Sequence, residues 1–176
     1  MAFVFIVPSA NGLPSLPCCL ARRGGRLESV MTPWQLFSQL GFEGRRQVHL
    51  SLCEDALLTW TDYVKGKPRA LRYRDSVVGI RHRVDVELPA DALGAARVGV
   101  DLADVGTRYL EPMTAMQDDD LAFPDSVAFA YYAIYNCFRK YVRGDDIPDQ
   151  LIVNQALSAH DDSEVVARLM RAIDEI

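Results

Sequence analysis

The stretch ALRYRDSVVGIRHRVDVEL, residues 70–88, carries the clearest strand pattern in the chain. Its second half alternates between two sets of side chains. One set holds four aliphatic residues and a histidine, namely Ile80, His82, Val84, Val86 and Leu88. The other set is charged and comprises Arg81, Arg83, Asp85 and Glu87. Because successive side chains of a strand point to opposite faces, this alternation is typical of a strand whose first set, His82 included, faces inward.

The first half of the same stretch supplies a partner strand. A tight turn at residues 75–76 would fold the stretch onto itself and place Tyr73 opposite Val78 on the inward face. The register of the strands and the hydrophobic pattern then agree. The stretch therefore predicts an antiparallel hairpin between residues 70–74 and 77–88.

Two further segments alternate in the same way and extend the sheet. Residues 47–52 and residues 97–102 each alternate apolar and polar side chains, and each is predicted to be a strand. Between the first of these and the hairpin, apolar residues at helical spacing predict a helix from Glu54 to a stop at Gly66.

Helices are predicted at both ends of the chain from Met31 onward. Thr32 and Gln35 can form a capping box around Pro33, which predicts a short helix that stops at Gly41. In the last third, apolar residues on more than one side predict a long central helix over residues 125–143.

Two shorter helices complete the chain, and two segments join the elements. One helix is predicted from Pro148 through Leu157, and the last one starts at Ser158 or Asp161. Residues 90–96 are predicted to be a short connector with at most one helical turn, and residues 106–120 a long loop or short extended pieces.

This order of elements predicts the fold class. Strands grouped in the middle and helices grouped at the ends are typical of α+β proteins. We expect a small, mostly antiparallel sheet of about four strands covered by helices, with a helical C-terminal third. On length alone, residues 31–176 are expected to be a single α+β domain.

The first thirty residues differ from the rest and leave two interpretations open. Three prolines interrupt residues 1–30, and a clean helix start follows directly after Met31. The segment is therefore either a poorly ordered N-terminal tail or a non-native extension of the reading frame, with translation starting at Met31.

Composition excludes several classes of protein. The chain has 176 residues, 49% of them hydrophobic, and no apolar run long enough to span a membrane. Four cysteines without paired spacing exclude a disulfide scaffold, and a net charge of −5 argues against general nucleic-acid binding. We expect a soluble, cytoplasmic protein without a membrane partner.

Candidate catalytic residues are few. Cys53 precedes a predicted helix, where a helix N-terminus lowers the pKa of a thiol. His49 has the same strand parity and is the nearest possible base. The three histidines lack metal-ligand spacing, and no glycine-rich phosphate loop is present, so we expect no metal and no cofactor.

Charge is distributed unevenly along the chain. Residues 111–176 carry 13 acidic and five basic residues, and the run Asp118, Asp119 and Asp120 has no capping role. Residues 65–83 carry seven basic residues and one acidic residue, which a solvated sheet face would explain.

Two functions remain open at this point, beside a third possibility in which the basic residues of segment 65–83 contact the phosphates of a nucleic acid. We expect a non-enzymatic binding protein, for example of the toxin-neutralising kind, which meets a basic protein partner through its acidic C-terminal half and the Asp118–Asp120 run. The alternative is a small enzyme with a dispersed site around Cys53 and His49 or around that acidic run.

Overall fold

The computed structural model describes residues 31–65, 67, 71–160 and 163–176. The expected α+β fold with about four strands is wrong, because the described residues are mostly helical and their only sheet has two strands. The two interpretations of residues 1–30 lie outside the described residues. So do Gly66, Ala70 and Asp161, which had been assigned to the ends of elements.

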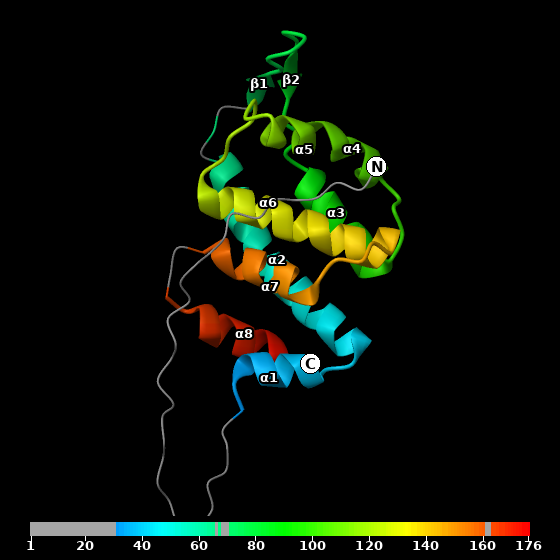
Figure 1. The fold of residues 1–176 in the computed structure, drawn as a ribbon, viewed down its shortest axis with the longest axis vertical. Helices are drawn as coiled ribbons and strands as arrows, with labels where there is room; N and C mark the ends of the chain where they lie inside the picture. The colour runs from blue at the N-terminus through cyan, green and yellow to red at the C-terminus, as the bar shows by residue number, and fades with distance from the viewer. Residues whose placement is uncertain (1–30, 66, 68–70, 161–162) are drawn as a thin grey trace, which may run out of the picture. The chain divides into compact units, whose positions relative to one another are not determined.

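The helices follow one another along almost the whole described chain (Figure 1). They are α1 Pro33–Gln39, α2 Phe42–Lys65, α3 Leu88–Val98, α4 Val105–Arg108, α5 Leu110–Gln117, α6 Asp125–Phe138, α7 Asp149–Ser158 and α8 Val165–Asp174. A π-helical turn, Arg139–Arg143, continues α6 directly. The strands are β1 Arg72–Arg74 and β2 Arg81–Arg83.

Helix α6 lies at the centre of this arrangement. It packs against α2, α3 and α7, and most of its side chains are buried. Ala130, Ala133 and Ile134 are completely shielded from water. The predicted long helix over residues 125–143 is confirmed, with its last five residues in the π-helical turn.

Helix α2 replaces the strand predicted over residues 47–52. Val48, Leu52, Ala56 and Trp60 recur every four residues and are all buried, so they form one ridge along the helix. A six-residue alternation fits both a strand and a helix that is covered on several sides. Contacts with α3, α6, α7 and α8 cover α2 on several sides, and the strand prediction was therefore wrong.

The segment after the hairpin is also helical where a strand and a loop were expected. Pro89 lies in the first turn of α3, where its missing N–H costs nothing, and Gly99 ends the helix with a positive φ of 78°. The strand predicted over residues 97–102 is wrong, because α3 extends to Val98 and Gly99 ends it. Val100 and Leu102, which were predicted to face inward, are exposed. Helices α4 and α5 occupy much of the expected loop.

The predicted hairpin exists, but with a different register and with a second strand of only three residues, Arg81–Arg83, in place of residues 77–88. Tyr73 pairs with His82, not with Val78, and the turn extends over residues 75–80. Val78 and Ile80, both predicted to face inward, are therefore exposed. The orientation of β2 is confirmed, because His82 faces inward between two exposed arginines.

The terminal helices agree best with the sequence. Thr32 and Gln35 form the predicted capping box at the start of α1. Helix α7 has almost the predicted bounds, whereas α8 begins at Val165, later than predicted. Helices α1 and α8 pack together at the opposite end of the fold from the hairpin (Figure 1). None of the described helices is both long and apolar enough to cross a lipid bilayer.

Candidate functional site

Cys53 lies inside the core and not at a helix N-terminus. It is fully buried in the middle of α2. A hydrogen bond with the Cys137 thiol of α6, together with burial, raises the pKa of Cys53 well above its ordinary value. Because the thiolate is the nucleophilic form, this environment disfavours nucleophilic chemistry.

His49 is one helical turn from Cys53, and its side chain has other partners. Its Nδ1 shares a hydrogen bond of 2.6 Å with the hydroxyl of Tyr141. Its Nε2 lies 4.0 Å from Oδ1 of Asp149 and has no hydrogen-bond partner among the described residues. Burial lowers the pKa of His49 to about 4, so the ring is neutral at physiological pH.

The π-helical turn brings the other members of this cluster together. It carries Lys140, whose Nζ lies 3.1 Å from Asp149, and Tyr141, which reaches His49. Arg45 of α2 pairs with the same carboxylate at 3.1 Å. The cluster thus ties α2, the π turn and the start of α7 together. Because His49 is completely shielded from solvent, a substrate cannot reach it in this conformation.

An open pocket of about 450 Å³ lies between the inner face of the hairpin and helices α4 and α5. We call it the acidic pocket. Its lining consists of Tyr73, Asp75, His82, Thr107, Leu110, Glu111, Thr114, Ala115, Asp118 and Asp120. Four of these ten residues are carboxylates and none is lysine or arginine, so the lining carries a negative charge.

Glu111 is held in place by the two aromatic side chains of the hairpin. The Tyr73 hydroxyl donates a 2.9 Å hydrogen bond to Oε1 of Glu111, and His82 contacts the same oxygen through Nδ1. The Tyr73 and His82 rings stack with centroids 5.2 Å apart. Burial and the neighbouring Glu111 raise the pKa of Tyr73, so its hydroxyl stays protonated and acts as a donor.

The Asp118–Asp120 run divides between the acidic pocket and the surface. Asp120 accepts hydrogen bonds from the backbone N–H of Ser76 at 2.9 Å and from its hydroxyl at 3.2 Å, which fastens the hairpin turn to the end of α5. Asp118 lines the acidic pocket and is exposed, whereas Asp119 is not part of the lining. Asp119 has a positive φ of 59°, which aspartate tolerates better than most residues.

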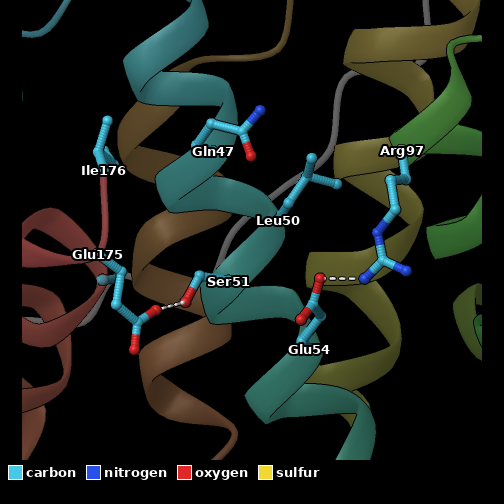
Figure 2. A pocket seen from close by; sticks show the side chains of 8 residues that line it. Gln47, Leu50, Ser51, Glu54, Arg97, Glu175 and Ile176 are labelled. Atoms are coloured by element: carbon cyan, nitrogen blue, oxygen red, sulfur yellow. Dashed lines mark hydrogen bonds and ion pairs between the residues drawn. The ribbon is translucent and has the colours of Figure 1, made fainter.

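A second, smaller pocket of about 270 Å³ lies among α2, α3 and the chain end after α8 (Figure 2). Its polar side chains largely satisfy one another. Arg97 pairs with Glu54, and the Ser51 hydroxyl donates a 3.0 Å hydrogen bond to Glu175. These pairs occupy the groups that would otherwise meet a ligand.

The sequence pointed to some of these residues and missed others. Tyr73 and His82 were expected to face inward, and Asp118 and Asp120 were expected to bind a partner. Glu111 was missed because nothing in a presumed loop marked it. Tyr141 and Asp149 were missed because their meeting with His49 depends on how three distant segments pack.

Comparisons with known proteins identify no relative: no family model, no curated protein and no solved structure matches this chain. Over the residues that the structure describes, no group of three or more His, Cys, Asp or Glu is placed to hold a metal ion.

Proposed function

We propose that this chain is a binding protein that receives a cationic side chain of a basic protein partner in the acidic pocket. The observation that carries the proposal is the lining of that pocket, with four carboxylates and neither lysine nor arginine around a volume of about 450 Å³. A guanidinium or ammonium group is the natural complement of such a site.

Part of the pocket is already organised for binding. The carboxylate of Glu111 is oriented by Tyr73 and His82, and Asp120 is held by Ser76. Asp118 makes no side-chain hydrogen bond or ion pair with any described residue, so its acceptors remain available.

The alternative function, a small enzyme, has less support from the same residues. A cysteine nucleophile needs a thiolate and a neighbouring base. Cys53 is paired with Cys137 and His49 with Tyr141, and both candidates are fully buried. These contacts favour a role in stability for both residues, and the binding function is the one that we carry forward.

Binding of a labelled hexa-arginine peptide, measured by fluorescence anisotropy, tests the proposal. Asp118→Asn should weaken binding about two- to fivefold, the range for one exposed ion pair. Asp119→Asn is the matched control, because it removes the same charge from the adjacent residue outside the pocket. Asparagine also tolerates the positive φ at this position. Equal effects of the two substitutions, or no binding of the peptide, would refute the acidic pocket as the site.

A further inference from the structure

The outer face of the hairpin concentrates positive charge. Arg72 pairs with Arg83 and Arg74 with Arg81 across the two strands, and all four side chains are exposed. Cross-strand partners and residues two apart share a face, so the four arginines form one surface, which we call the arginine face. Like charges directly opposite each other destabilise a strand pair, and an anionic partner would relieve this repulsion.

Beyond the arginine face, the tip of the hairpin is apolar. Val77 is 85% exposed, Val78 62% and Ile80 56%. The hairpin stands out above α4 and α5, so the tip is the part of this end that extends furthest from the helices (Figure 1). An apolar cluster at such a position is typical of a docking site.

The backbone of the tip is prepared for an apolar environment. The N–H groups of Val77 and Val78 both donate to Oδ1 of Asp75 at 2.8 Å. The N–H of Ser76 donates to Asp120, and that of Gly79 to the carbonyl of Asp75. Four successive amides are therefore satisfied inside the protein, as a nonaqueous environment requires. The two carboxylates nearest the tip are used in these bonds.

We propose that the hairpin docks the protein peripherally on an anionic lipid surface. Along the hairpin the apolar tip comes first, then the row of Arg74 and Arg81, then the row of Arg72 and Arg83 roughly 7 Å behind it. This order matches the depth profile of a membrane, with acyl chains below a layer of phosphate. Docking of this kind needs no spanning helix and does not depend on the proposed function of the acidic pocket. It departs from the expectation that the protein has no membrane partner.

The phosphates of a nucleic acid would complement the arginine face, but a nucleic acid offers no apolar layer for the tip of the hairpin. The groove of a DNA duplex could contact the arginines, but the apolar tip could insert there only if base pairs were unstacked. The satisfied amides of the tip favour a lipid environment over a hydrated groove.

Flotation with vesicles of phosphatidylcholine alone, or with 30% phosphatidylserine, tests the charge requirement. The full chain should bind the phosphatidylserine vesicles at least tenfold more strongly, and salt should weaken this binding. Arg72→Gln with Arg81→Gln should reduce binding more than tenfold, because each basic residue near such a surface contributes about fivefold. Lys65→Gln with Arg171→Gln removes the same charge elsewhere and should have less effect.

Tryptophan quenching by brominated acyl chains tests the insertion of the tip. Val77→Trp should be quenched when phosphatidylserine vesicles are added, relative to the unmodified chain with its two native tryptophans. Leu102→Trp, at an apolar residue that is 83% exposed but far from the hairpin in sequence, should not be quenched. Equal binding to both vesicle types, equal quenching at the two positions, or binding of a DNA duplex without vesicle binding would overturn the proposal.

Discussion

His49 occupies the core as a neutral imidazole, and burial is the main reason. Burial lowers its pKa from the ordinary 6.5 to about 4, although Asp149 acts in the opposite direction. In the unfolded chain the pKa returns to its ordinary value. Between these two values the unfolded state binds a proton that the folded state does not. Stability therefore falls as the pH drops through this window.

We predict that His49 lowers the free energy of unfolding by about 3 kcal/mol as the pH falls from 6.5 to 4. Urea denaturation at closely spaced pH values measures this slope. His49→Gln keeps a neutral polar side chain at this position and should make the slope shallower by that amount. His82→Gln, at the half-buried histidine of the hairpin, is the matched control. Equal slopes for the unmodified chain and His49→Gln would contradict the prediction.

Individual side chains differ in how far their surroundings follow from the sequence. The orientation of His82 needs only the two-residue period of a strand, and it was predicted correctly. The surroundings of Cys53 and His49 depend on Cys137 and Tyr141, which are far away along the chain. No local pattern carries that information, so the expected pairing of Cys53 with His49 had no physical basis in the folded protein.

At the scale of single elements, the hairpin combines a correct prediction with a wrong register. The side-chain faces of the paired residues were right because they depend on local alternation, whereas Ile80, predicted to face inward, is exposed in the turn. The pairing was wrong because it depends on the length of the turn. Asp75, whose carboxylate binds two amides of the turn, stabilises a six-residue loop in place of a tight turn. Such a loop exposes Val78 and places Arg74 directly opposite Arg81.

We predict that Arg81→Glu stabilises the protein, because it converts a like-charge pair with Arg74 into an opposite-charge pair. The expected gain in the free energy of unfolding is about 0.2–1 kcal/mol, measured by urea denaturation. Arg81→Gln should give a smaller gain, since it removes the repulsion without adding an attraction. An unchanged or lower free energy of unfolding in Arg81→Glu would contradict the prediction.

Helix α2 shows why short alternation is an unreliable sign of a strand. The six residues from Gln47 to Leu52 span less than two helical turns, over which both periods fit. The ridge that begins at Val48 and ends at Trp60 continues the helical period well beyond this segment. A longer window would have distinguished the two structures.

At the scale of the whole described fold, α6 is a central helix whose side chains are mostly buried. It contacts α2, α3 and α7, and its central side chains are completely buried. Loss of packing at α6 should therefore weaken several helices together, whereas loss of a surface contact should remain local.

We predict that Ile134→Ala lowers the free energy of unfolding by about 2–5 kcal/mol, as expected for a fully buried isoleucine. Hydrogen exchange should show the loss in α2, α3 and α7 alike, because all three pack on α6. Ile80→Ala makes the same chemical change at an exposed position and should alter stability by less than about 0.5 kcal/mol. A loss confined to α6 would contradict the central role of this helix.

The fold class was mispredicted because two local errors reinforced each other. Reading residues 47–52 and 97–102 as strands suggested partners for the hairpin and hence a sheet of about four strands. Helical packing against α6 determines the structure of the first segment, and Gly99 interrupts the second. The helices with capping signals or long apolar stripes, α1, α6 and α7, were predicted well because their evidence is local.

The π-helical turn Arg139–Arg143 also bears on how the chain tolerates changes in length. Such a turn holds one residue more than the α-helical turn that it replaces, and it is equivalent to a single-residue insertion. Each helical residue rotates the following side chains by about 100°. Deleting one residue here would restore a regular helix but turn Tyr141 away from His49. The extra residue of this turn is therefore what lets the end of the central helix reach His49 of α2.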